Sequence, residues 1–354
     1  MPDALTSLAE AIRAAAADGR LLRIRGGGTK DFYGQLLAGE ILDTRGYAGI
    51  VAYDPTELVV TVRCGMPLAD LEAALREKRQ MLAFEPPHFG ASATVGGAVA
   101  AGLSGPRRAA AGAVRDFVLG VRLLDGRGQD LTFGGQVMKN VAGYDVSRVM
   151  AGALGTLGVV VEVSLKVLPV PVAEATLRFE MPEDKSLEAV TRWAGRPLPI
   201  SATAYTDGDL GVRLSGAAAA VRAAQEKLGG TLVEGEPAAR FWHGIREHSD
   251  PFFAGAEPLW RLSVPSATPP LGLEGRSLIE WGGALRWIKS HAEARTVRDA
   301  AARAGGHATL FRGGDKSVGV FHPLAPAVAT IHRRLKAEFD PRGVLNRGRM
   351  YPDF

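Results

Sequence analysis

Cysteine is almost absent from this chain: Cys64 is the only one among 354 residues. A single cysteine excludes a disulfide within the chain, and it excludes an iron–sulfur cluster or cysteine-based metal site built from this chain alone. Long apolar runs are missing as well, because no segment approaches the ~20 consecutive apolar residues of a membrane-spanning helix. The first residues also lack the pattern of a secretion signal. We therefore expect a cytoplasmic protein that reaches the inner face of a membrane only through partners.

Charge of one sign is not concentrated anywhere in the sequence. The formal net charge is +4, and the densest basic clusters, Arg107-Arg108 and residues 332–334, are too short to form a nucleic-acid-binding face. Hydrophobic residues make up 46% of the chain and charged residues 23%, which is typical of a globular protein with an ample core. The length suggests two domains. The small positive excess favours anionic ligands such as phosphates and carboxylates.

Glycine, by contrast, is abundant and is gathered in loops. The stretch RGGGTK, residues 25–30, is not a P-loop because Lys30 follows a threonine, and it is not a dinucleotide fingerprint because Asp31 stands where a third glycine is needed. Two more glycine loops follow, GASATVGGAVAAG at residues 90–102 and GALGTLG at residues 152–158. One such loop is most simply a tight turn. Three loops near strand-like runs favour a ligand with a pyrophosphate, which successive backbone N–H groups can bind.

Apolar periodicity predicts mixed α and β structure on both sides of a boundary near residues 169–171. A helix is expected over residues 8–18, capped by Ser7 and ended by Gly19. Residues 159–167 alternate between apolar and polar, which predicts a strand with one buried face. Beyond the boundary, strand and helix patterns suggest a smaller α+β domain on an antiparallel sheet.

Several stretches together carry a resemblance to a known family. RGGGTK, DPTELVVTVRCG, TVGGAVAAGLSG, VRDFVLGVRLLDGRG and GYDVSRVMAGALGTLGVVVEVSLKVLP occur in the order found in the PCMH-type FAD-binding domain of the vanillyl-alcohol-oxidase flavoproteins. The tail FDPRGVLNRG resembles the C-terminal motif of that family, although Arg347 stands where a proline is usual. EPPHFGASATVGGAVAAGLSGPRR, FGGQVMKNVAGYD, WGGALRWIKS and AGGHATLF further resemble the FAD-binding subunits of bacterial glycolate oxidase (glycolate dehydrogenase).

The resemblance implies an α+β fold in three parts. A two-subdomain PCMH-type FAD-binding domain would span residues 1–171, a smaller α+β cap domain with an antiparallel sheet residues 172–335, and a C-terminal segment, residues 336–354, would return to the FAD domain. FAD would be bound non-covalently, because Thr29 occupies the position of the histidine that tethers flavin in some relatives. Cys64 reads as a small buried residue. The implied FAD-binding residues are Arg25, Gly26, Gly27, Gly28, Thr29, Lys30, Ser92, Ala93, Thr94, Val95, Gly96, Gly97, Gly102, Gly105, Gly155, Thr156, Gly158, Val159 and Asn346, the last expected near the isoalloxazine end.

The catalytic residues are not identified by the sequence. The paired-histidine motif H-x-G-D-G-N-x-H and the later E-H-G motif of related 2-hydroxyacid dehydrogenases are both missing. Lys139, Asn140 and Tyr144 are candidates for the substrate face of the flavin, unless Lys139 is simply solvated and Tyr144 packs beneath the loop. His307, in the segment GGHATLF, is a candidate for a role in the site, or else a structural hydrogen-bonding residue at the start of a strand. Trp281 and Trp287 are expected either in the core or at an interface with a sister subunit.

Three functions stay open from the sequence. In the first, the chain is the FAD-binding subunit of a glycolate dehydrogenase complex that oxidises glycolate to glyoxylate, beside a second FAD-binding subunit and an iron–sulfur subunit. In the second, it is a stand-alone FAD-dependent 2-hydroxyacid dehydrogenase. In the third, its FAD is structural or relays electrons without substrate turnover of its own. No metal site is expected in any of the three.

Overall fold

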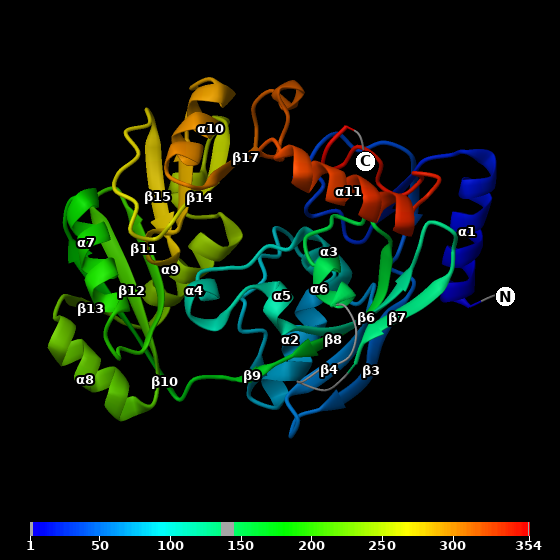
Figure 1. Cartoon of the computed structure of the whole chain (residues 1–354). Helices are drawn as coiled ribbons and strands as arrows, with labels where there is room; N and C mark the ends of the chain where they lie inside the picture. The colour runs from blue at the N-terminus through cyan, green and yellow to red at the C-terminus, as the bar shows by residue number, and fades with distance from the viewer. Residues whose placement is uncertain (1–2, 136–144, 353) are drawn as a thin grey trace. The chain divides into compact units, whose positions relative to one another are not determined.

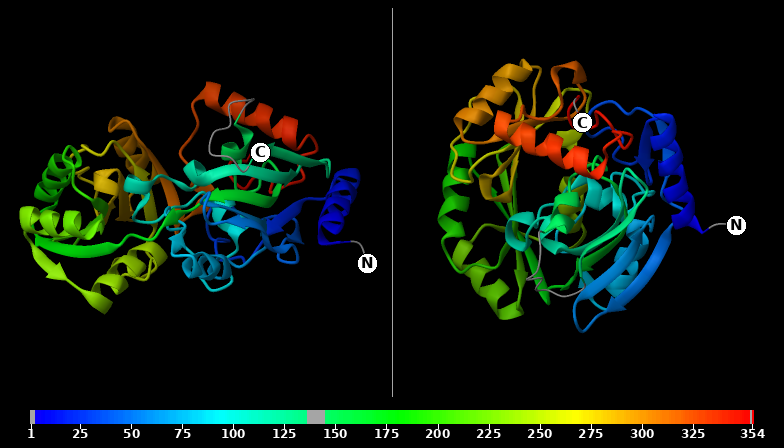
Figure 2. Two further views of the ribbon diagram at one scale, coloured as in Figure 1. Left: turned by 90° about the horizontal axis from the view of Figure 1, so that it is seen from below. Right: turned by 45° about the vertical axis from the view of Figure 1, so that its right-hand side comes forward.

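The computed structural model describes residues 3–135, 145–352 and 354 of the chain. These residues form two compact units (Figures 1 and 2). Unit 1 comprises Met1–Leu103, Ala113–Pro169 and Pro323–Phe354, and unit 2 comprises Ser104–Gly112 and Val170–His322. The predicted domain boundaries at residues 171 and 335 stay a prediction. Within the described residues, no helix is both long enough and apolar enough to cross a bilayer.

Unit 1 is built on a five-stranded antiparallel sheet with strand order β3-β4-β8-β6-β7 (Figure 1). Its strands are β3 (Ala48–Asp54), β4 (Val59–Cys64), β6 (Val118–Leu124), β7 (Asp130–Gly134) and β8 (Val159–Lys166). Two small sheets accompany it, the parallel pair β1 (Leu22–Arg25) and β2 (Glu40–Asp43) and the antiparallel pair β5 (Gln80–Met81) and β9 (Leu168–Pro169). The helices are α1 (Ala4–Asp18), α2 (Leu68–Glu77), α3 (Val95–Ala101), α5 (Val114–Phe117), α6 (Val146–Met150) and α11 (Pro326–Phe339).

The sequence patterns explain several of these elements. In β8, Val159, Val161, Val163 and Leu165 are buried, as the alternation predicts, and the strand pairs with both β4 and β6 in the middle of the sheet. The end of α1 at Gly19 is confirmed by a left-handed φ of 69°.

The predicted start of α1 is wrong. The helix begins at Ala4, four residues before the expected Leu8, because the Asp3 carboxylate accepts a hydrogen bond from the Thr6 N–H at 2.7 Å and takes the capping role expected of Ser7.

The C-terminal segment packs along β1 inside unit 1. The Leu22 N–H donates to the Val344 carbonyl at 2.7 Å, and the Asn346 N–H donates to the Leu22 carbonyl at 2.9 Å. Val344 and Leu345 are both buried. The end of the chain lies beside α11 in both views of Figure 2. The His332 ring of α11 contacts the Phe354 ring, with 5.6 Å between the ring centroids. The segment therefore supports the strand that leads into the first glycine loop.

Unit 2 is built on one eight-stranded sheet with strand order β13-β10-β12-β11-β15-β16-β14-β17, in which the paired strands are antiparallel. This confirms the predicted antiparallel sheet. The strands are β10 (Ala173–Glu180), β11 (Ile200–Thr206), β12 (Asp209–Gly216), β13 (Thr231–Val233), β14 (Leu259–Ser263), β15 (Arg276–Glu280), β16 (Leu285–Lys289) and β17 (His307–Arg312). The helices are α4 (Arg108–Ala111), α7 (Glu183–Ala194), α8 (Ala218–Leu228), α9 (Gly235–Glu247) and α10 (Ala294–Arg303), with the 3-10 turns η1 (Pro251–Phe253), η2 (Trp281–Gly283) and η3 (Lys316–Val318).

Two tryptophans of unit 2 had alternative roles, and both are core residues. Trp281 and Trp287 are 5% and 4% exposed. The indole N–H of Trp281 donates to the Gly105 carbonyl at 3.0 Å, and that of Trp287 donates to the Glu280 carboxylate at 2.7 Å. Each polar edge is satisfied within the unit, as a buried indole requires.

Candidate functional site

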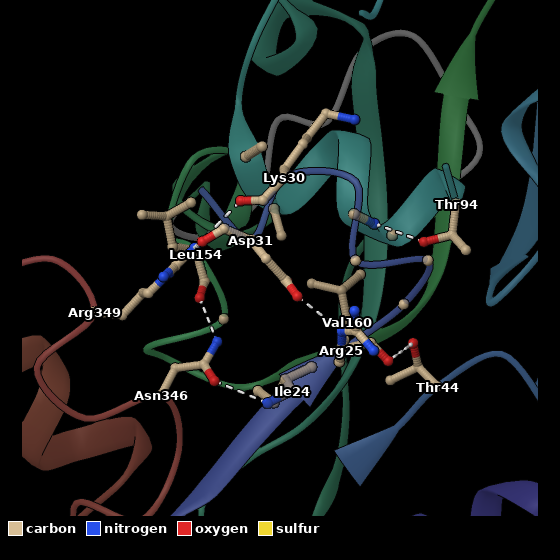
Figure 3. A pocket seen from close by; sticks show the side chains of 18 of the residues that line it. Ile24, Arg25, Lys30, Asp31, Thr44, Thr94, Leu154, Val160, Asn346 and Arg349 are labelled. Atoms are coloured by element: carbon tan, nitrogen blue, oxygen red, sulfur yellow. Dashed lines mark hydrogen bonds and ion pairs between the residues drawn. The ribbon is translucent and has the colours of Figure 1, made fainter. Parts of the chain in front are cut away.

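A pocket lies in unit 1 at the carboxyl end of β1 (Figure 3). Its empty volume, including the solvent at its mouth, is about 910 Å³. Segments that are distant in the sequence line it: the first glycine loop, the start of α3, the loop before β8 and the C-terminal segment. The lining residues are Ile24, Arg25, Gly26, Gly27, Gly28, Thr29, Lys30, Asp31, Leu37, Thr44, Thr94, Gly96, Gly97, Ala100, Ala101, Met150, Ala153, Leu154, Gly155, Gly158, Val160, Asn346 and Arg349.

The glycines of the first loop are required by close packing against the second loop. A Cβ on Gly26 would lie 2.3 Å from Oγ1 of Thr94, and a Cβ on Gly27 would lie 1.5 Å from the carbonyl oxygen of Ser92. Both separations are far inside van der Waals contact. Gly28 has a left-handed φ of 74°, which disfavours other residues there. The glycine run therefore brings two loop backbones together at one wall of the pocket.

This wall presents backbone donors. Among the described residues, the N–H groups of Gly26, Gly27, Gly28 and Thr29 find no acceptor. The N–H of Gly96, in the first turn of α3, finds none either, whereas the next N–H, that of Gly97, is satisfied by Oγ1 of Thr94 at 3.2 Å. Clustered N–H groups of this kind bind anions, and a helix N-terminus adds a favourable dipole.

The charged side chains at the pocket favour the binding of an anion. The Asp31 carboxylate accepts hydrogen bonds from Arg23 at 2.5 Å and from Arg25 at 2.9 Å, so its charge is compensated. Arg349 is buried, and its guanidinium donates to the carbonyls of Gln35 at 2.5 Å, Asp31 at 3.1 Å and Lys30 at 3.3 Å. Burial lowers the pKa of Arg349 to about 10, so the side chain is still a cation at neutral pH.

Asn346 joins the opposite walls of the pocket (Figure 3). Its Oδ1 accepts the Ile24 N–H at 2.8 Å, and its Nδ2 donates to the Leu154 carbonyl at 2.6 Å. The residue has a φ of 42°, a left-handed conformation that asparagine tolerates better than most residues. A Cβ on Gly155 would come within 2.8 Å of Nδ2, so this glycine makes room for the bridge.

The structure brings most of the predicted cofactor residues to this pocket. Twelve of them line it: Arg25, Gly26, Gly27, Gly28, Thr29, Lys30, Thr94, Gly96, Gly97, Gly155, Gly158 and Asn346. The others do not: Ser92, Ala93, Val95, Gly102, Thr156 and Val159 belong to unit 1 but are not among the lining residues, and Gly105 belongs to unit 2. The assignment of FAD contacts to all of these residues stays a prediction.

The pocket-lining residues that the sequence did not predict include Ala100, Ala101, Val160 and Arg349. Val160 lines the pocket whereas Val159 is buried in the core, and the alternation of β8 carried that signal. Ala100 and Ala101 lie one helical turn after the predicted Gly96 and Gly97, so helical spacing could have added them. Arg349 sits in a tail with no periodic pattern, and no local signal identifies it.

No catalytic candidate within the described part of the chain lines the pocket. Lys139, Asn140 and Tyr144 lie outside the described residues. His307 begins β17 in unit 2 and does not line the pocket. Partial burial lowers the pKa of His307, and the nearby Arg261 and His322 lower it further. Among the residues that the structure describes, no group of three or more potential metal ligands occurs.

Cys64 is confirmed as a packing residue. Its side chain is 2% exposed, and burial raises the pKa of the thiol well above its usual range. A Cβ on Gly96 would lie 2.6 Å from the Cβ of Cys64, so the cysteine packs beneath the start of α3. It is an unreactive thiol.

A family match assigns the chain with this fold and donor-lined pocket to the PCMH-type FAD-binding proteins. The sequence profile of the FAD binding domain family matches residues 1–149. A solved structure of alkyldihydroxyacetonephosphate synthase shares the fold with a TM-score of 0.67 at 15% identity, covering 98% of this chain and 76% of that one.

Sequence relatives narrow the class. The glycolate oxidase subunit GlcE of Escherichia coli K12 is 50% identical over 347 residues, covering 98% of this chain and 97% of the relative. The chain therefore belongs to the family of glycolate oxidase GlcE subunits, which confirms the resemblance seen in the sequence. The glycolate oxidase subunit GlcD of Bacillus subtilis is 34% identical over 128 residues, 36% of this chain and 27% of the relative. The protein is thus an FAD-dependent oxidoreductase with FAD as its cofactor.

Proposed function

We propose that the chain is the FAD-carrying subunit of a complex that oxidises glycolate to glyoxylate and passes the electrons to an iron–sulfur partner. The identity to a glycolate oxidase subunit along nearly the whole chain supports the substrate. The observation that carries the cofactor role is the convergence of the N–H groups of Gly26–Thr29 and Gly96, none of which has an acceptor among the described residues, on one pocket.

Each wall of the pocket has a task in this proposal. When bound, FAD would supply the oxidising chemistry, as the acceptor of a hydride from the carbon that bears the substrate hydroxyl. The N–H groups of the first loop and of Gly96 bind the pyrophosphate, and Arg349 adds positive charge nearby. The glycines keep side chains out of the space beside the phosphates. Thr29 has no imidazole, so it holds the cofactor without a covalent bond.

The electrons need a second protein. Oxidation of glycolate to glyoxylate releases two electrons and two protons, and an iron–sulfur cluster carries the electrons singly. Such a cluster needs several thiolates, whereas this chain has only the buried Cys64. The subunit names of its relatives, GlcE and GlcD, imply a multi-subunit enzyme. We propose a second FAD-binding subunit and an iron–sulfur subunit as partners in the cytoplasm, with any membrane contact made by those partners.

Anaerobic mixing with glycolate tests the proposal. The purified chain is loaded with FAD, and its visible flavin absorption is followed with and without the partner subunits. Bleaching of the flavin by glycolate supports the proposal when it occurs in the chain alone, or in a complex whose second FAD-binding subunit has been freed of its own flavin. A chain whose flavin stays oxidised in a complex that turns over glycolate would contradict it and favour a structural or electron-relay role. Equal bleaching by many 2-hydroxy acids in the chain alone would favour the stand-alone dehydrogenase.

A further inference from the structure

Lys336 is the buried residue of α11, and it is a charged one. The side chain sits on the fourth turn of the helix and is 6% exposed. Its Nζ donates to the Thr156 carbonyl, to Oδ2 of Asp340 and to the Leu345 carbonyl, each at 2.7 Å. An ammonium group has three protons, so every donor is used. The burial of the charge is therefore compensated by one ion pair and two carbonyls.

Asp340 completes the arrangement at the end of α11. Its carboxylate is 2% exposed and accepts the N–H groups of Val344 at 3.1 Å and Leu345 at 2.8 Å, in addition to the Lys336 ammonium. A Cβ on Gly126 would lie 2.3 Å from Oδ1 of Asp340, so the carboxylate has space only because residue 126 is glycine. The ion pair thus fixes the turn by which the chain leaves α11 and enters the C-terminal segment.

The Lys336 ammonium binds two segments of the chain that belong to different walls of the pocket. Thr156 is buried between Gly155 and Gly158, both of which line the pocket. Leu345 immediately precedes Asn346, which lines the pocket and bridges Ile24 to Leu154. Lys336 and Asp340 are not lining residues themselves. The ion pair therefore contacts both the loop at residues 155–158 and the segment before Asn346, without lining the pocket itself.

We propose that the Lys336–Asp340 ion pair positions the loop at 155–158 and Asn346 for the cofactor, and so sets the affinity and bound geometry of FAD without contacting it. The inference rests on the proposed FAD seat in this pocket. Charge-assisted hydrogen bonds are about twice as strong as neutral ones. Without the ammonium, the carbonyls of Thr156 and Leu345 and the Asp340 carboxylate face one another with no shared donor, and the two walls separate.

The test compares two lysine-to-methionine variants of the full chain. Lys336→Met removes the tie behind the pocket. Lys289→Met is the matched control, because Lys289 is also buried, donates to the Ala254 carbonyl and pairs with Glu257, but it belongs to unit 2. FAD is titrated into the apo-chains, and flavin fluorescence gives Kd. Visible circular dichroism at saturating FAD reports the geometry of the bound flavin, which a mere loss of stability does not change.

We expect Lys336→Met to raise Kd for FAD about tenfold or more and to alter the visible circular dichroism, as loss of a buried partner predicts. Lys289→Met should stay within about twofold of the unchanged chain, since its tie lies elsewhere. All five tryptophans, residues 193, 242, 260, 281 and 287, lie in unit 2, so their fluorescence shows whether unit 2 is intact in each variant.

A second variant keeps the inference testable if Lys336→Met does not fold. Asp340→Asn preserves the shape and one acceptor but removes the charge, and it should weaken FAD binding in the same direction. A folded variant of either kind with unchanged Kd and unchanged circular dichroism overturns the inference. Gly27→Ala separates this failure from failure of the site: if Gly27→Ala also leaves Kd unchanged, the pocket is not the FAD seat, whereas if it alone loses FAD, only the role of the ion pair is wrong.

Discussion

Oδ1 of Asn346 accepts the backbone N–H of Ile24 at 2.8 Å, although 322 residues separate the two along the chain. The same amide donates to the Leu154 carbonyl from its nitrogen. Asn346 is thus a bridge between β1, which leads into the first glycine loop, and the loop that precedes β8. The amide oxygen of Asn346 accepts one hydrogen bond and the amide nitrogen donates the other. A substitution that removes only the donor therefore tests the bridge.

Asn346→Asp keeps the size and shape of the side chain but replaces its donor with an oxygen that faces the Leu154 carbonyl. We expect the free energy of unfolding to fall by about 1–3 kcal/mol, the cost of an unsatisfied buried polar group. FAD should be released faster, because the bridged walls form the pocket. Urea unfolding and the rate of flavin release on dilution measure the two effects. Unchanged values for both would show that the hydrogen bonds of Asn346 contribute neither to the stability of the fold nor to the retention of FAD.

Thr29 determines how the cofactor leaves the protein. A threonine hydroxyl does not form the histidyl bond to flavin, and Cys64 is buried with a raised thiol pKa. We therefore expect acid or detergent denaturation to release all the FAD into the soluble fraction. Flavin fluorescence of the denatured chain after gel electrophoresis provides the measurement. A fluorescent protein band would mean that the attachment is covalent.

His248 predicts a loss of stability in mild acid. It ends α9, and its ring stacks on Phe253 with 3.9 Å between ring centroids. Burial lowers the pKa of His248 well below its ordinary 6.5, and Arg312 and Arg261 lower it further. The folded chain therefore keeps the ring neutral while the unfolded chain binds a proton. The stability is fully present above pH 6.5 and is lost as the pH falls from there towards the folded pKa.

The slope of that loss is measurable. A single histidine of this kind costs at most about 1.4 kcal/mol per pH unit in the window below pH 6.5. Urea unfolding followed by tryptophan fluorescence reports unit 2, where His248 and every tryptophan lie. His248→Asn tolerates the left-handed φ of 55° and removes the titration. Its stability should be lower at pH 7.5 but should fall less steeply with acid. An equal slope in both proteins would assign the effect to other groups.

Local patterns in the sequence predict some elements of the fold and part of the site. The alternation of β8 and the glycine spacing are visible in the residues themselves, because they follow from strand period and backbone conformation. The cap of α1 was misplaced because Asp3 and Ser7 are both good capping residues, and the choice depends on where the first turn packs.

Contacts between segments that are distant in the sequence could not be predicted from local patterns. Lys336 reads as one more surface lysine of an amphipathic helix, yet it binds the Thr156 carbonyl 180 positions away. Asp31 places an acid directly after the first glycine loop, and its partners Arg23 and Arg25, which compensate its charge, are not indicated by any spacing in the sequence. The partner of such a side chain is set by tertiary packing, for which a single sequence offers no period or spacing.

One substitution tests whether FAD binds in the pocket bounded by the first glycine loop. Gly27→Ala places a Cβ 1.5 Å from the Ser92 carbonyl oxygen at the wall that presents the donors. Gly46→Ala is the matched control, because no atom lies within 4 Å of the added Cβ. The flavin-to-protein ratio of the two purified chains is the measurement. We expect Gly46→Ala to retain its FAD and Gly27→Ala to lose it; a Gly27→Ala chain that is fully loaded with FAD would show that FAD binds elsewhere.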